Sequence, residues 1–224
     1  MDPADIITID GPSGSGKSTM SRLLAARMSY AYLDTGAMYR AVGLKTLKEG
    51  LDPDDEDGLT KLLANLDLKI LPGEDDSKVI LDQQDVSLEI RTPEIGMMAS
   101  KVSAKQVVRQ QLTELQRRLA EKGRVVVEGR DMGTVVFPHA RNKFYLDAKP
   151  EERARRRTHQ LHKKGMDAEF NEILTQIQKR DDDDSHRSLA PLKPASDAVI
   201  IDSSEMTINQ VVDFMVEKID NRLV

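Results

Sequence analysis

The chain contains no cysteine and no tryptophan, and aromatic residues make up only 4% of its 224 residues. Without cysteine there can be no disulfide framework, no zinc site built from thiolates and no cysteine nucleophile. The shortage of aromatic side chains also leaves little material for stacking nucleic-acid bases. These absences exclude disulfide-stapled scaffolds and thiolate metalloproteins, and they disfavour a base-stacking nucleic-acid binder.

Long apolar runs are missing as well. The longest unbroken stretches, such as Val125-Val126-Val127, fall far short of the roughly 18 residues that a membrane-spanning helix needs. The acidic N-terminal residues 1–5 fit no secretory or transit signal. We therefore expect a cytoplasmic protein with no membrane partner.

The balance of charge is acidic. There are 33 lysines and arginines against 38 aspartates and glutamates, so the formal net charge is −5. A general nucleic-acid binder needs a field that concentrates phosphate backbones, and this balance argues against one. Small phosphorylated ligands remain possible, provided that the positive charge is local.

Strand-like and helix-like patterns alternate along most of the chain. Short apolar or β-branched runs predict strands at 6–10, 31–33, 125–128, 143–147 and 198–202. Helical spacing of apolar residues predicts helices at 17–28, from about 36 to about 48, at 103–122 and at 208–219, with further helical patterns between the last two strands. Five short strands joined largely through helices indicate a parallel sheet covered on both faces.

One segment has a different character. Short runs at 66–71, 79–82 and 86–89, separated by Pro72-Gly73 and by polar turns, predict a small antiparallel sheet, and an acidic loop at 52–57 precedes them. A length of 224 residues suits one core that carries such an insertion.

A complete local motif follows the first predicted strand. It matches the P-loop pattern G-x-x-x-x-G-K-S/T at every specified position, in Gly11, Pro12, Ser13, Gly14, Ser15, Gly16, Lys17 and Ser18, with Thr19 next. Glycines let the backbone wrap around phosphate, and the following helix N-terminus adds partial positive charge. Lys17 would reach the β- and γ-phosphates, and the Ser18 hydroxyl would bind Mg²⁺. The motif therefore predicts a nucleoside triphosphate with magnesium, but not the reaction.

Three classes of protein share this motif: regulatory GTPases, nucleic-acid motors and kinases for small acceptors. A guanine-reading GTPase usually carries N-K-x-D, whereas here Asn142-Lys143 is followed by Phe144-Tyr145 and the carboxylate is missing. The acidic net charge argues against a motor. Acids at strand ends help little, because four predicted strands end in one: Asp10, Glu128, Asp147 and Asp202.

The arginines favour a kinase. Phosphoryl transfer from ATP to a monophosphate brings about six negative charges together, so several guanidiniums should converge on the site. No general base is needed, since the acceptor phosphate is already ionised. The candidates lie at the ends of predicted elements: Arg40, Arg130, Arg180 and Arg187.

Four further arginines lie within five positions on one predicted helix: Arg153, Arg155, Arg156 and Arg157. Such a cluster repels itself without an anion, so we interpret it as part of a mobile lid over phosphate, in which only some members face the ligand. The run 181–184 is interpreted as a solvated turn that holds one functional carboxylate.

Four blocks in this order resemble the bacterial cytidylate kinase family over nearly the whole chain. They are the P-loop, the block 33–40, the block 129–138, and Arg180-Asp181-x-x-Asp184-x-x-Arg187 followed by Ala190-Pro191-Leu192. The P-loop is generic, whereas the block 129–138 and the spacing from Arg180 to Arg187 are specific. Two departures are small: Thr35 stands where serine is common, and Glu128 where aspartate is common.

The resemblance implies a P-loop nucleoside monophosphate kinase fold with a five-stranded parallel core. The core would comprise 1–35, 101–148 and 166–224. An enlarged monophosphate-binding domain with the antiparallel insertion would comprise 36–100, and an arginine-rich lid 149–165.

The resemblance also implies transfer of the ATP γ-phosphoryl group to CMP or dCMP, giving ADP and CDP or dCDP. By it, Lys17, Arg130 and Asp131 are catalytic, and the P-loop with Thr19, Arg153 and Arg157 binds ATP. The implied CMP-binding residues are Thr35, Arg40, Ser100, Arg109, Arg130, Asp131, Arg180, Asp184 and Arg187. Among them, Ser100, Arg109 and Asp131 would read the cytosine.

Mg²⁺ would be the one cofactor, with Ser18 as its protein ligand. We expect a monomer with small-molecule partners and no nucleic-acid partner. Two alternatives stay open: a P-loop kinase for UMP, AMP or a non-nucleotide such as shikimate, and a P-loop switch without an acceptor.

Overall fold

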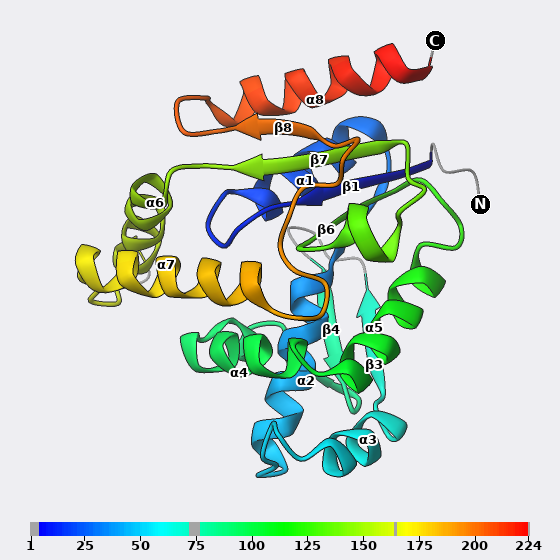
Figure 1. The fold of residues 1–224 in the computed structure, drawn as a ribbon, viewed down its shortest axis with the longest axis vertical. Helices are drawn as coiled ribbons and strands as arrows, with labels where there is room; N and C mark the ends of the chain where they lie inside the picture. Colours follow the sequence, from blue (N-terminus) through cyan, green and yellow to red (C-terminus); the bar gives the residue numbers. More distant parts are fainter. Residues whose placement is uncertain (1–4, 72–76, 164, 224) are drawn as a thin grey trace. The chain divides into compact units, whose positions relative to one another are not determined.

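The computed structural model describes residues 5–71, 77–163 and 165–223 (Figure 1). The predicted turn Pro72-Gly73 and the N-terminal residues 1–4 lie outside them. The chain forms two compact units: Met1–Ala31 with Arg124–Val224, and Tyr32–Gly123. The second unit is thus one continuous stretch, and where the chain leaves and re-enters the first unit the Ala31 N–H donates to the Arg124 carbonyl over 2.8 Å.

The first unit contributes four whole strands to a five-stranded sheet, whose edge strand Ala31–Asp34 continues into the second unit. Its order is β2-β6-β1-β7-β8, from strands β1 (Ile6–Asp10), β2 (Ala31–Asp34), β6 (Val125–Gly129), β7 (Asn142–Asp147) and β8 (Val199–Asp202). Central β1 pairs in parallel with β6 and β7. Every residue of β1 and β6 is buried, which fits short β-branched runs covered on both faces. The predicted five-stranded parallel sheet is confirmed.

The helices of this unit pack on the sheet and on one another. Helix α1 (Lys17–Met28) contacts β6 and α8 (Ile208–Leu223), while α6 (Pro150–Lys163) packs on α7 (Phe170–His186). The α6–α7 contact buries Ala154, Leu161, Ile173 and Ile177. In Figure 1, α6 follows the arrowhead end of β7, so both helices lie near the carboxyl edge of the sheet, where ligands of open α/β sheets bind.

The prediction of a solvated turn over 181–184 is wrong. These residues form part of the last third of α7, and Asp184 is buried. Carboxylates near a helix C-terminus are unfavourable on their own, because they face the negative end of the helix dipole. Here the cost is offset by arginines, since Asp181 pairs with Arg153 and Asp184 with Arg130.

The second unit combines helices with a small antiparallel sheet. Its helices are α2 (Thr35–Lys48), α3 (Glu56–Ala64), α4 (Pro93–Ser103) and α5 (Gln106–Leu119), and its strands are β3 (Leu68–Leu71), β4 (Lys78–Leu81) and β5 (Gln84–Asp85). The strands pair in the order β3-β4-β5, each antiparallel to the next. The predicted antiparallel insertion is confirmed, although α3 and α4 were not predicted.

The third strand of this sheet lies earlier than predicted. Asp82 and Gln83 both have positive φ, 48° and 69°, so the chain reverses directly after β4 and pairing starts at Gln84. The Asp85 carboxylate then accepts from the Ser87 N–H and hydroxyl, which turns the chain away from the sheet. Within the expected strand 86–89, residues 87 and 88 form a turn, and a 3₁₀ helix over Glu89–Arg91 begins at the last residue.

Capping explains the two helices that were missed. Asp55 accepts from the Gly58 N–H and starts α3 inside the predicted acidic loop, and Thr92 with Pro93 starts α4. Within the described ranges, no helix is long and apolar enough to cross a bilayer.

Two glycines of the second unit should respond oppositely to alanine. A Cβ on Gly43 of α2 would lie 3.0 Å from the Ala99 backbone nitrogen of α4, whereas one on Gly96 of α4 would meet nothing within 4 Å. We expect Gly43→Ala to lower the free energy of unfolding by about 1 kcal/mol or more through overpacking. Gly96→Ala should raise it by about 0.5–1 kcal/mol through helix propensity. Urea unfolding measures both, and a stabilised Gly43→Ala would contradict the close approach of α2 and α4.

Candidate active site

The P-loop joins the end of β1 to the start of α1. Gly11, Gly14 and Gly16 have φ values of 148°, 78° and 96°. A Cβ on Gly11 would lie 2.0 Å from the Leu146 carbonyl oxygen in β7, so this position has no room for any side chain. Gly16 caps α1 without a side chain, which leaves the first-turn amides of α1 able to donate to an anion.

Lys17 is buried inside this loop. Its Nζ donates to the Pro12 carbonyl over 2.6 Å. Burial, with a smaller contribution from the Arg130 charge, lowers the pKa of Lys17 to about 7, against the attraction of Glu128 and Asp10. In the absence of phosphate the amine is therefore held by the loop itself and titrates near neutral pH.

Asp10 fixes the turn that follows β6. Its two carboxylate oxygens accept from the backbone N–H groups of Met132 and Gly133, each over 2.8 Å. Burial raises the pKa of Asp10 to about 6, although these two hydrogen bonds favour its ionised form. The bonds anchor the π-helical turn Met132–Val136, which directly follows Arg130 and Asp131.

Sequence reasoning did not assign Asp10 to the site. Its position at a strand end directly before Gly11 was a signal, but three other strands end in an acid as well.

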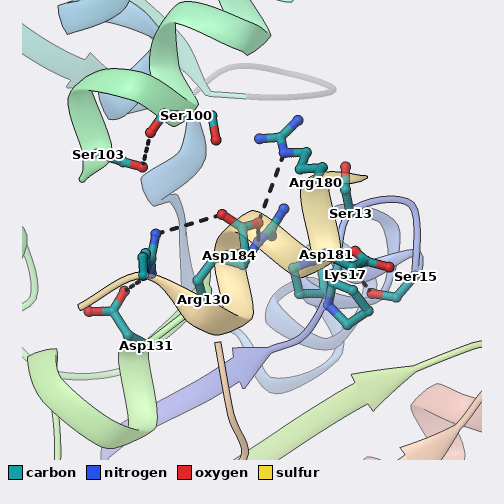
Figure 2. A network of polar contacts seen from close by, with 12 residues as sticks. Ser13, Ser15, Lys17, Ser100, Ser103, Arg130, Asp131, Arg180, Asp181 and Asp184 are labelled. Atoms are coloured by element: carbon teal, nitrogen blue, oxygen red, sulfur yellow. Dashed lines mark hydrogen bonds and ion pairs between the residues drawn. The ribbon is translucent and has the colours of Figure 1, made fainter. Parts of the chain in front are cut away.

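Five predicted site residues, Asp184 and four others, form one network of polar contacts (Figure 2). Arg130 Nε donates to its Oδ2 over 2.9 Å, Arg187 Nη1 lies 3.7 Å from Oδ1, and Arg180 Nε lies 4.0 Å from Oδ2. Arg187 Nη2 also lies 3.9 Å from Asp131 Oδ1. Burial opposes ionisation of Asp184, but the three arginines hold its pKa below the usual range. Three guanidiniums thus converge on one buried carboxylate, and guanidiniums are the side chains best suited to bind phosphate oxygens.

The arginines of the predicted lid have protein partners. Arg153 binds Asp181, Arg155 binds Glu152 on its own helix, and Arg156 donates to the Ser203 carbonyl over 2.7 Å. Arg157 is half-buried. The repulsion expected within this cluster is therefore offset inside the protein, and the lid itself stays a prediction.

The second unit carries Thr35 and Arg40 at the start of α2. Thr35 is buried, and Arg40 Nη2 donates to Asp34 Oδ2 over 2.8 Å. Asp34 also caps α2 by accepting from the Ala37 N–H. A Cβ on Gly36 would lie 3.1 Å from Arg40 Nη1, so the glycine leaves room for the guanidinium to fold back over the helix start.

Ser100 and Arg109 also belong to the second unit. Arg109 is buried, donates to the Ser103 carbonyl over 3.3 Å, and lies 5.8 Å from the centroid of the Tyr39 ring. Ser100 is partly exposed on α4, and its carbonyl accepts from the Ser103 hydroxyl. Tyr39, which the sequence did not single out, thus shields the guanidinium of Arg109 by a cation–π contact.

Ser18 suits the magnesium that a P-loop implies. Its side chain is exposed on the first turn of α1. Mg²⁺ usually takes one or two protein oxygens together with substrate phosphates and water. Among the residues that the structure describes, no group of three or more histidine and acidic side chains is gathered to hold an ion. A hydroxyl with ligand phosphates fits this arrangement better than an all-protein cage.

Comparison with known proteins places this site in a family. A model described as "Cytidylate kinase" matches residues 7–221. The chain is similar to the cytidylate kinase of Carboxydothermus hydrogenoformans, with 46% identity over 96% of this chain and 97% of that protein. It is also similar to the cytidylate kinase of Vibrio cholerae, with 48% identity over 98% of this chain and 97% of that protein. The chain belongs to the cytidylate kinase family.

Membership in the cytidylate kinase family confirms the predicted family and the phosphotransferase class, and it implies use of ATP. Solved structures agree on the fold alone. An uncharacterized protein from Eubacterium ventriosum superposes with a TM-score of 0.54 at 13% identity, over 96% of this chain and 98% of that one. TT1252 from Thermus thermophilus does so with a TM-score of 0.50 at 17% identity, over 98% of this chain and 97% of that one.

Lys17 should take up a proton when ATP binds. With a pKa of about 7 in the free protein, the amine is mostly neutral at about pH 8, and the triphosphate will raise this pKa again. We expect calorimetric titration with ATP at about pH 8, in buffers of different ionisation enthalpy, to give uptake approaching about one proton.

Lys17→Arg is the matched control, because its guanidinium keeps its charge throughout this range. It should bind ATP without this uptake. Equal proton uptake by the wild type and this variant would contradict the assignment to Lys17.

Proposed function

We propose that this chain transfers the γ-phosphoryl group of ATP to CMP or dCMP, giving ADP and CDP or dCDP. The observation that carries the proposal is the arginine cluster around Asp184, in the same unit as the P-loop, in a member of the cytidylate kinase family. The P-loop accounts for the binding of one anion, the triphosphate. Arg130, Arg180 and Arg187 are suited to bind a second anion, the acceptor phosphate.

On the donor side, the P-loop amides and Lys17 hold the triphosphate. Arrival of the γ-phosphate gives the Lys17 ammonium a stronger acceptor than the Pro12 carbonyl that holds it in the free protein. Ser18 would hold Mg²⁺, which when bound neutralises charge on the phosphate oxygens. Arg157 of α6 is the proposed lid contact to the donor.

On the acceptor side, Arg130 and Arg40 hold the phosphate of CMP. One of its oxygens is already ionised near neutral pH and attacks the γ-phosphorus in line, so the new P–O bond forms as the bond to the β-phosphate oxygen breaks. No covalent enzyme intermediate is required. Arg180 and Asp184 contact the sugar, and Arg187 assists there or at the phosphate. Positioning and charge neutralisation supply the catalysis.

Cytosine recognition is assigned to Asp131, Arg109 and Ser100. The exocyclic N4 amino group of cytosine is a donor for the Asp131 carboxylate, while O2 and N3 accept from a guanidinium or a hydroxyl. Asp131 is buried and directly follows Arg130 at the end of β6. An ionised carboxylate can only accept hydrogen bonds, so Asp131 would disfavour binding of a base that presents only an acceptor at this position.

The remaining parts of the proposal concern organisation. Thr35 is placed in the CMP-binding set, closure of 149–165 excludes water that would otherwise hydrolyse ATP, and 36–100 moves as the monophosphate-binding domain. Magnesium dependence, a monomeric state and a cytoplasmic location complete the proposal.

An acceptor panel tests the function. We expect ATP-dependent release of ADP with CMP and dCMP, far less with UMP and AMP, and almost none without an acceptor. A preference for UMP, AMP or a non-nucleotide would mean that this compound, and not CMP, is the acceptor. Hydrolysis of ATP without an acceptor would indicate a switch.

Lys17→Ala should lower turnover by at least about 100-fold, because it removes charge stabilisation at the transferred group, while far-UV circular dichroism remains unchanged.

Asp131→Ala tests base reading. We expect kcat/KM for CMP to fall by about 100-fold or more, as when a buried base contact is lost, while the KM for ATP changes by less than about threefold. Asp131→Asn, which offers one carbonyl acceptor in place of two, should fall between Asp131→Ala and the wild type. Steady-state kinetics with each substrate varied in turn measures both constants, and an equal loss on both substrates would argue against base reading.

A further inference from the structure

Every guanidinium nitrogen of Arg153 donates to a protein oxygen. Nε donates to the Ala148 carbonyl over 2.8 Å, and Nη1 donates to the Ser13 carbonyl over 3.0 Å. Nη1 and Nη2 also donate to the two carboxylate oxygens of Asp181, over 3.1 Å and 2.6 Å. The side chain is only 3% exposed. A guanidinium held in this way has little left to offer a phosphate, although the sequence led us to expect Arg153 among the ATP-binding residues.

These contacts join three parts of the first unit. Ser13 belongs to the P-loop, Ala148 lies two residues before the start of α6, and Asp181 lies on α7. The first turn of α6 also sits directly on the loop, because a Cβ on Gly14 would lie 3.3 Å from the Arg153 Cβ. The arginine therefore fixes the tip of the phosphate loop against the helix pair α6 and α7.

Helix α7 carries this constraint onward to the acceptor side. Asp181 follows Arg180 directly and precedes Asp184 by one helical turn, so the three residues share one rigid element. The buried contact between α6 and α7 through Ala154 and Ile177 supports the same arrangement. A shift of the Arg153–Asp181 pair would move Arg180 and Asp184 relative to the P-loop.

We infer that Arg153 is a positioning residue of the phosphoryl transfer, acting with Asp181 to fix the donor loop relative to the acceptor-binding residues of α7. The inference rests on the proposed function, because it assigns donor and acceptor to these two places. Arginine is required rather than lysine, because a planar fork can donate to the carboxylate and to the Ser13 carbonyl at once. A misplacement of about 1 Å can lower a transfer rate about 100-fold without a change in any group that touches substrate.

A double-mutant cycle tests the inference. Arg153→Lys and Asp181→Asn should each lower kcat by about tenfold or more, with the KM values for ATP and CMP within about threefold of the wild type. Because both substitutions break one coupled pair, the double variant should be no slower than the slower single variant. Asp181→Glu, which keeps both acceptor oxygens, should recover part of the lost kcat.

The matched controls lie one or two positions away on the same helices. Arg155→Lys changes an exposed arginine that pairs with Glu152, and Asp182→Asn changes an exposed acid beside His186. Both should keep the wild-type kcat. Thermal melting of each variant separates loss of folded protein from loss of rate, with kcat measured well below every melting temperature.

Three results would overturn the inference. In the first, Arg153→Lys raises the KM for ATP while Asp181→Asn has no effect, as expected for a direct ATP ligand. In the second, the two losses multiply in the double variant. In the third, both variants melt earlier but keep the wild-type kcat, which would leave a purely structural role.

If Arg153→Lys does not fold, the two Asp181 variants decide: wild-type kcat in Asp181→Asn overturns the inference, and a loss recovered in Asp181→Glu supports it. The wild type tests the proposed function separately. If it does not phosphorylate CMP, the function fails; if it does and the Asp181 variants match it, only the positioning role fails.

Discussion

Arginines that lie close together need acidic partners, and two carboxylates of one helix supply them here. Asp184 holds Arg130, Arg180 and Arg187 within 4.0 Å, and Asp181 holds Arg153. Without these acids, the guanidiniums would repel one another and turn toward solvent. Both acids lie on α7, so this one helix determines the positions of the four guanidiniums. At the P-loop the positive charge is limited in another way, because burial lowers the pKa of Lys17 to about 7.

The edge of the central sheet supplies the second fixed reference. Asp10 ends β1 and holds the backbone after Arg130 and Asp131, while Gly11 begins the P-loop at the next position. The P-loop and the segment after Arg130 and Asp131 are therefore both anchored at the end of one buried strand. Buried core strands are among the last elements to open in a folded protein. The relative position of these two segments is therefore fixed by the most stable part of the unit.

Local patterns were enough to predict the strands of the parallel sheet, the P-loop and most of the residues around Asp184. Each of these rests on a short run of sequence: β-branched residues for β1, a fixed glycine spacing for the loop, and the i, i+4, i+7 spacing of Arg180, Asp184 and Arg187 along the end of α7 and its C-cap. One misread segment depended on partners far away in the chain, and the other on the backbone conformation of two neighbouring residues. The acids at 181–184 become helical because Arg153 and Arg130 pair with them, and β5 starts early because two residues adopt positive φ. The contacts of Arg153 with Asp181 and Ser13 were not predicted either, because these partners lie 28 and 140 positions away in the chain.

The hydrogen bond between Ala31 and Arg124 has a consequence for how such a chain can diversify. It closes the base of an excursion that spans all of Tyr32–Gly123. Because this hydrogen bond holds the two ends of the stretch together, segments within it can lengthen, shorten or be exchanged at little cost in loop-closure entropy. The unit that carries the P-loop keeps its own fold. Insertions and exchanges can then accumulate in one unit while the fold of the other is inherited unchanged.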